Sequence, residues 1–118
     1  MRENELSLDR ETQRIYEELK KIARNKGMTN YSDMGDLIGL DMSTEYGRVR
    51  IAHILDDINK IEDQRGRPML SSLVIHKDGN MPGSGYFECA SGLGKFTGQD
   101  KLEFWANEVN EVHKYWSK

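Results

Sequence analysis

The chain has 118 residues, of which 36% are hydrophobic and 31% are charged, and its formal net charge at pH 7 is -3. This length fits one domain with one core, and it is too short for two units that fold independently. The negative net charge argues against a protein that coats nucleic acid through bulk electrostatics, although it is compatible with a local basic patch.

Cysteine usage and hydropathy predict where the protein works. Cys89 is the one cysteine, which excludes an internal disulfide framework and favours a reducing compartment. Residues 1–5 carry mixed charge with no apolar run behind them, and no window approaches the ~18 apolar residues that a membrane span needs. We therefore expect a cytoplasmic protein with no membrane partner.

Three helices are predicted in the first half of the chain. Between residues 8 and 26, with Asp9 as a candidate N-cap, one helical stripe contains Ile15, Leu19 and Ile22. Asn30 offers a cap for a short second helix that Gly39 ends. A polar connection over residues 41–44 leads to a long amphipathic helix that ends near Arg65, with apolar residues Val49, Ile51, Ala52, Ile54, Leu55, Ile58 and Ile61.

A β-hairpin and a terminal helix are predicted in the second half. After Pro68, residues 70–76 have the β-branched content and the length of a strand. Residues 77–80 form an Asp-Gly turn, residues 81–85 are rich in Gly and Pro, and residues 86–90 return as a second strand. Residues 97–100 resemble a capping box for the last helix, whose expected inner face is Leu102, Trp105, Ala106, Val109, Val112 and Trp116.

This order of elements predicts an α+β fold of the winged helix-turn-helix type, with three helices, a β-hairpin wing and a C-terminal helix. The second and third helices would form the turn-linked pair, and the hairpin would form the wing. We expect residues 1–118 to make a single winged-helix-like domain in which residues 1–7 are disordered.

Residues 31–86 resemble the DNA-binding domain of the alkylguanine DNA alkyltransferases and their alkyltransferase-like relatives. The matching pieces are Asn30-Tyr31-Ser32-Asp33, Leu37-Ile38-Gly39-Leu40, Arg48 or Arg50, Pro68, Leu73-Val74-Ile75 and Asp78-Gly79. The resemblance implies a winged helix that binds DNA. It does not imply alkyl transfer, because the family has a nucleophilic Cys, then His and Arg, directly after the proline, and this chain has Met69-Leu70-Ser71-Ser72.

A more specific resemblance is to bacterial domains that carry an Arg-Gly-x-Pro-x-Leu stretch, an apolar strand and a loop rich in Gly and Pro. The matching segments are Arg65-Gly66-Arg67-Pro68-Met69-Leu70 and Lys77-Asp78-Gly79-Asn80-Met81-Pro82-Gly83-Ser84-Gly85-Tyr86. Those domains have no settled biochemical role, so this second resemblance supports the fold more than a function.

The first functional hypothesis is a non-catalytic module that binds double-stranded DNA, as a regulator or a DNA-processing accessory domain. The third helix would enter the major groove with its arginines, and the following loop would contact the backbone or the minor groove. The candidate DNA contacts are Tyr46, Arg48, Arg50, Arg65, Arg67, Lys77 and Ser84. The alternative for Arg48 and Arg50 is a solvated helix face that pairs with Asp41, Glu45 or Asp57.

The second hypothesis is a protein-interaction or dimerisation module. It rests on the net negative charge, on residues 31–45, which hold Asp33, Asp36, Asp41 and Glu45 without a base, and on a second apolar strip of the last helix with Phe104 and Tyr115. Partner binding or homodimerisation would use the C-terminal helix and the acidic second helix.

The third hypothesis, an enzyme that uses Cys89, has little support in the sequence. No His or Lys stands beside Cys89 to lower the pKa of its thiol, so we interpret it as a structural residue. The spacing of His53, His76 and His113 does not suit a zinc site. We expect no catalytic residues, metal or cofactor, and we interpret Asp56 and Asp57 as part of a solvated helix face.

Overall fold

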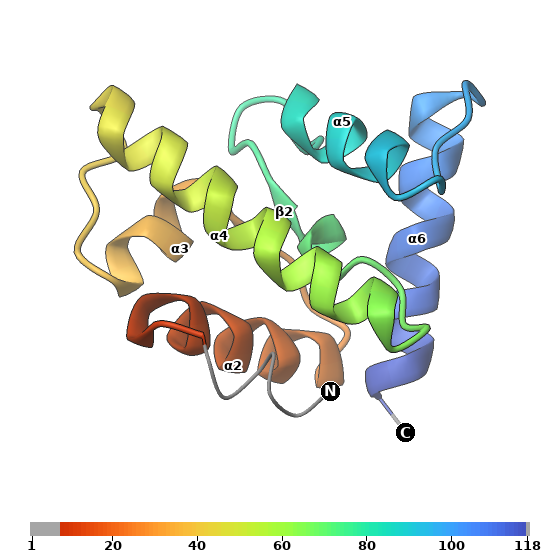
Figure 1. Ribbon diagram of the computed structural model, residues 1–118, viewed down its shortest axis with the longest axis horizontal. Helices are drawn as coiled ribbons and strands as arrows, with labels where there is room; N and C mark the ends of the chain where they lie inside the picture. The colour runs from red at the N-terminus through yellow and green to blue at the C-terminus, as the bar shows by residue number, and fades with distance from the viewer. Residues whose placement is uncertain (1–7, 118) are drawn as a thin grey trace.

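Helices make up most of residues 8–117, the part of the chain that the computed structural model describes. In chain order the elements are α2 (Arg10–Arg24), β1 (Thr29–Asn30), α3 (Tyr31–Leu37), α4 (Glu45–Gln64), the 3-10 turn η1 (Leu70–Leu73), β2 (Val74–Ile75), α5 (Ser84–Gly92) and α6 (Lys101–Trp116) (Figure 1). The expectation of disorder for residues 1–7 lies outside the described residues. No helix within residues 8–117 is both long and apolar enough to cross a membrane.

The first three helices begin where the sequence predicts, because polar side chains cap them. The Asp9 carboxylate accepts a hydrogen bond from the Thr12 amide at 2.7 Å, and the Asn30 side chain accepts one from the Asp33 amide at 2.8 Å. Such bonds satisfy amide groups that have no partner in the first turn of a helix. The predicted caps at Asp9 and Asn30 are therefore confirmed.

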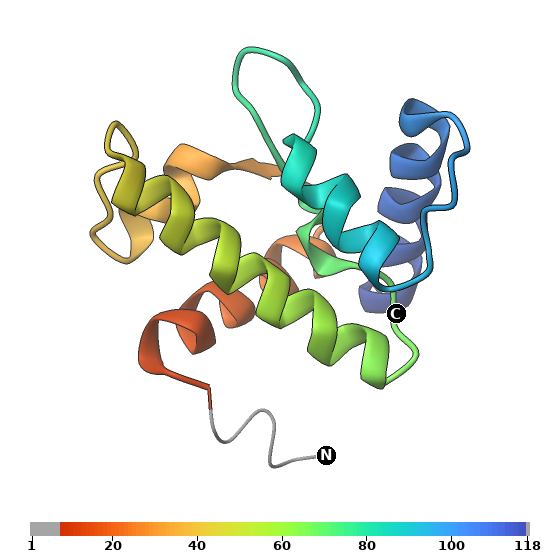
Figure 2. The ribbon, with the colours of Figure 1, turned by 45° about the horizontal axis from the view of Figure 1, so that its top comes forward.

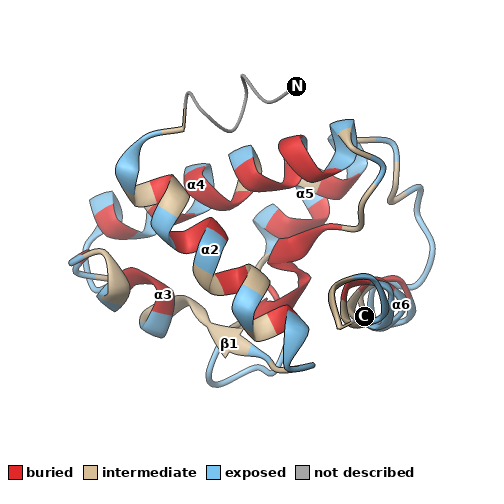
Figure 3. Ribbon diagram, turned by 90° about the horizontal axis from the view of Figure 1, so that it is seen from below, coloured by how far each residue is buried: buried red, intermediate tan, exposed pale blue. Residues whose placement is uncertain are grey.

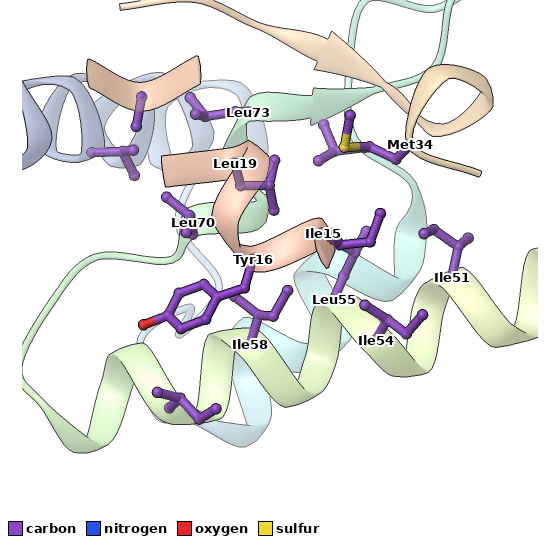
Figure 4. Packing of buried hydrophobic residues seen from close by; sticks show 14 of the residues in the cluster. Ile15, Tyr16, Leu19, Met34, Ile51, Ile54, Leu55, Ile58, Leu70 and Leu73 are labelled. Atoms are coloured by element: carbon purple, nitrogen blue, oxygen red, sulfur yellow. The ribbon is translucent and has the colours of Figure 1, made fainter. Parts of the chain in front are cut away.

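The main core lies where α2, α3, α4 and α6 converge on η1 and β2 (Figure 3). The apolar stripes of α2 and α4 face each other, and η1 closes the space between them (Figure 4). The completely buried side chains there include Ile15, Leu19, Ile54, Ile58, Leu70 and Leu73. Burial of each such side chain contributes about 1.5–3 kcal/mol.

The predicted hairpin wing is wrong, because its second strand is helix α5. Tyr86, Phe87 and Ala90 are buried, and this spacing places them on one side of a helix, whereas a strand would alternate them with Glu88. Their side chains pack in a small second cluster with Met69 and Phe104. The aromatic residues favour a strand by local propensity, but burial against α6 decides for a helix.

The fold class expected from the sequence is corrected as well. Instead of a hairpin, the described residues contain a two-stranded parallel sheet in which Thr29 pairs with Val74 and Asn30 with Ile75. Most of the predicted strand at residues 70–76 is the 3-10 turn η1. The protein is thus mostly helical. The predicted order of the helices α2, α3 and α4 is confirmed, but they are not part of a winged helix-turn-helix with a hairpin wing.

The expected inner face of α6 is confirmed in part. Val112 is buried, and three further residues of that face pack against the two clusters: Trp105, Val109 and Trp116. Leu102, however, is 58% exposed, Ala106 is exposed too, and Phe104, expected on a second face, is buried. The helix is capped by Asp100, which accepts from the Glu103 amide at 2.9 Å. Because Phe104 packs inside the molecule, it cannot belong to the exposed dimerisation strip that the sequence suggested.

A buried ion pair joins the end of α4 to α2. Glu62 is fully buried and accepts hydrogen bonds from the Tyr16 hydroxyl at 2.6 Å and from Arg67 at 2.9 and 3.0 Å. The Arg67 guanidinium carbon also lies 5.4 Å from the ring centre of Trp116. This two-pronged contact satisfies a carboxylate that would otherwise be costly to bury.

Loss of this ion pair should be strongly destabilising. We predict that Glu62→Ala lowers the free energy of unfolding by about 3–5 kcal/mol, because Arg67 keeps a partly buried charge without its carboxylate. Urea unfolding followed by circular dichroism measures the change, and Asp63→Ala on the neighbouring exposed residue is the control. A loss below ~1 kcal/mol for Glu62→Ala, typical of a surface pair, would contradict this role.

Asp9 should make stability depend on pH in acid. Hydrogen bonds from Arg50 and from the Thr12 amide lower the pKa of Asp9 from 3.8 to about 2. Because the folded-state pKa is depressed, this stabilisation is complete above pH 3.8 and is lost as the pH falls through about 2. Asn caps helices as well as Asp, so Asp9→Asn removes only the charge. Urea unfolding should show that this variant is less stable than the parent protein at neutral pH and equally stable at a pH near the folded-state pKa of about 2. A constant difference would contradict the prediction.

Candidate functional site

A cleft on the described surface lies between α4 and α5, two helices that run side by side (Figures 1 and 2). Its volume is about 640 Å³, within the range of ligand-binding clefts. We call it the α4–α5 cleft. Its apolar and aromatic lining is Tyr31, Met42, Ile51, Ala52, Leu55 and Tyr86; its polar lining is Ser32, Arg48, Asp56, Ser71, His76, Ser84, Glu88 and Cys89; Gly83 and Gly85 complete it.

One end of the cleft is held in shape by contacts between α3 and the loop before α5. The Gly83 amide donates to the Tyr31 hydroxyl at 2.9 Å, and the rings of Tyr31 and His76 lie 4.8 Å apart between centroids. A Cβ atom at position 83 would lie 3.0 Å from His76 Nε2, so glycine permits this close approach. Three segments distant in sequence therefore form one wall.

A small hydrogen-bonded network reaches the lining of the cleft at Ser71 and Cys89. The Asn59 amide group donates to the buried Ser71 hydroxyl at 2.7 Å and lies 3.8 Å from the Cys89 sulfur. Ser71 is thus held in place as an acceptor, and its own hydroxyl proton remains available to a group in the cleft.

Two titratable groups, Asp56 and Cys89, meet in this network across the helices. Burial raises the pKa of Cys89 to about 11, and the nearby Asp56 carboxylate raises it further. Burial likewise raises the pKa of Asp56, against the opposing effect of a hydrogen bond from the Cys89 thiol. At neutral pH Cys89 is therefore a thiol and a hydrogen-bond donor, which favours its interpretation as a structural residue.

The structure brings together some of the predicted DNA contacts. Arg48 and Ser84 both line the cleft. Arg48 donates to the Met42 carbonyl at 3.3 Å, which lays its side chain along the turn before α4. On the same helix Tyr46 is 70% exposed, and Lys77, beside the cleft-lining His76, is exposed as well.

Three other predicted contacts lie elsewhere. Arg50 is turned toward α2, where it pairs with Asp9 at 2.8 Å and with Glu11 at 2.9 Å. Arg67 is held by Glu62. Arg65 is the C-cap of α4, at the opposite end of the helix from Arg48. The expected continuous basic surface is therefore split between two ends and two sides of α4.

Sequence reasoning missed the residues that define the cleft. Asp56 was interpreted as part of a solvated face, yet it is half-buried beside Cys89. Ser71, His76 and Glu88 were given no common role. The missing step was the helix at residues 84–92, since only this helix places Glu88 and Cys89 opposite α4.

The environment of Cys89 should make it slow to react. A pKa of about 11 instead of 9.0 means about 100-fold less thiolate at pH 7. We predict correspondingly slow alkylation by iodoacetamide, followed by mass spectrometry, with a rate that rises up to about pH 11. Asp56→Asn should accelerate it by removing the neighbouring negative charge, whereas Asp57→Asn should not. Alkylation as fast as that of a free cysteine peptide would contradict the prediction.

Comparisons with protein-family models, with curated proteins and with solved structures found no match to this chain.

Proposed function

We propose that this chain is a protein-interaction domain, and that its α4–α5 cleft binds a segment of a partner protein with an apolar anchor and basic flanking residues. The observation that carries the proposal is a preformed cleft whose floor is apolar and whose surroundings are acidic. Such a combination suits an amphipathic peptide, because the floor supplies apolar contact and the rim supplies charge selectivity.

The apolar part of the site is continuous with the main core. Ile51 and Leu55 line the cleft and belong to the main core cluster. Tyr31 and Met42 also line the cleft and pack against that cluster. Apolar surface that borders polar side chains in this way is typical of interaction surfaces.

Charge complementarity favours a basic partner. Asp56 and Glu88 line the cleft itself. Next to the lining residues of α3 and of the following turn stand the exposed carboxylates of Asp33, Asp36, Asp41 and Glu45. These carboxylates outnumber the nearby cations Arg48, Lys60 and Lys77, and an anionic partner would meet repulsion.

Binding of double-stranded DNA is the second candidate, and Arg48 is the observation that favours it. Arg48 lies in the first part of α4 and forms no ion pair with any described carboxylate. The position suits contact with a phosphate or a guanine edge. However, Arg50 and Arg67 are engaged within the molecule, so few cations remain for the phosphate backbone.

Peptide selection tests the proposal. A random peptide library displayed on phage and selected against the protein should yield sequences with an apolar anchor and Lys or Arg beside it. Synthetic peptides made from them should bind with affinities that fall as salt increases. Ala52→Trp places a large ring at the lip of the cleft and should reduce binding at least about tenfold, equivalent to ~1.4 kcal/mol.

Ala106→Trp is the matched control, because Ala106 is an exposed helical alanine on α6, outside the cleft. It should leave peptide binding unchanged. Peptides that are insensitive to Ala52→Trp, or a selection without basic sequences, would refute the proposal. Binding of duplex DNA at low salt that is lost in Arg48→Ala would establish the second candidate instead.

A further inference from the structure

We propose that Asp56 and Glu88 form a cation subsite in the α4–α5 cleft, which receives a guanidinium or ammonium group whose apolar stem lies on Leu55. The inference rests on the proposed function and specifies which part of the partner enters the cleft. A partner segment would insert an arginine or lysine side chain here.

Asp56 has the surroundings of a carboxylate that lacks its counter-ion. It is half-buried on α4, it lines the cleft, and its side-chain hydrogen bond is with the weak donor Cys89. Lys60 and His53 on the same helix exert an electrostatic influence, but neither forms an ion pair with it within the described part of the chain. Removal from water is thus only partly offset by the charge of Lys60, without an ion pair.

Other shielded carboxylates of this protein do have cations. Glu62 is paired with Arg67 at 2.9 Å. Glu108 is paired with Lys95 at 2.8 Å and also accepts from the Met69 amide at 2.9 Å. Asp56 has no such ion pair within residues 8–117, and it lines the α4–α5 cleft. A cation of the ligand would form an ion pair with Asp56, as Arg67 does with Glu62.

Glu88 supplies the second carboxylate from the opposite wall. It is exposed on α5, one position before Cys89, and it lines the same cleft. Leu55 and Ile51 lie on the floor between the two helices. Long cationic side chains bury their methylene stems on apolar surface and direct the charge toward a polar rim, so this arrangement fits them.

Arg48 gives the subsite a direction. It is eight residues before Asp56 on α4, which corresponds to about 12 Å along the helix axis. A ligand cation is repelled at the Arg48 end and attracted at the Asp56 end. The backbone carbonyl groups of a bound segment would therefore lie toward Arg48, and its basic side chain toward Asp56 and Glu88.

Small aromatic probes test the subsite without knowledge of the partner. Benzamidine has a ring and a cation, benzamide is its neutral analogue of similar shape, and benzoate is an anion. In titrations followed by ¹H–¹⁵N NMR, benzamidine should shift the amide signals of residues 55, 56, 88 and 89 and should bind at least about tenfold more tightly than benzamide. Benzoate should leave these signals unchanged.

Variants decide whether the two carboxylates are responsible. Asp56→Asn should reduce benzamidine affinity about tenfold and leave benzamide affinity unchanged, which a general distortion of the cleft would not do. Glu88→Gln changes an exposed residue, so the fold is kept, and it should also weaken benzamidine binding. Asp57→Asn, one position along the same helix, is the matched control and should have no effect.

Equal affinities for benzamidine and benzamide, an absence of benzamidine shifts, or full affinity in Asp56→Asn would overturn the cation subsite. These outcomes are separate from the peptide test. If selected peptides bind, and if Ala52→Trp but not Asp56→Asn abolishes their binding, the proposed interaction domain is supported and only the cation subsite is refuted.

Discussion

Burial of the apolar stripe of α4 is the constraint on which the rest of the structure depends. Ile54 and Ile58 are fully buried, and Ile51, Leu55 and Ile61 are nearly so. This stripe packs against α2 and η1, and its edge at Ile51 and Leu55 continues into the floor of the cleft. Because core and site share these residues, this part of the cleft lining is anchored in the packed core.

The charges of the molecule are divided between structural and free roles. Asp9 and Glu11 with Arg50 connect elements that are far apart in the sequence, and the Glu62–Arg67 pair at the end of α4 is tied to α2 by the Tyr16 hydroxyl. Use of these arginines inside the molecule removes cations from the surface on which a nucleic acid would depend. Within residues 8–117 the carboxylates around the α4–α5 cleft have no comparable partners, so the free charge near the cleft is mainly negative.

The cleft itself is prepared before any ligand arrives. The bond from the Gly83 amide to Tyr31 and the ring contact with His76 fix its end, and Asn59 fixes Ser71 in its lining. A site whose walls are already ordered loses less conformational entropy on binding than a flexible one. The described residues thus combine apolar lining that belongs to the core with carboxylates, which is the basis for the proposed peptide-binding role.

The sequence by itself determined the α2, α3 and α4 helices, because their signals are local. The caps at Asp9 and Asn30 act within three residues, and the α4 stripe repeats with helical spacing.

Only the tertiary structure decided the state of residues 84–92, the burial of Phe104 on α6 and the partner of Arg50. Phe87 meets Phe104 from another helix, and Arg50 meets Asp9 across 41 positions. Such contacts outweigh local propensity, and no short window of sequence contains both members of the pair. For the same physical reason the meeting of Asp56 and Cys89 in one cleft became visible only when α5 was placed beside α4.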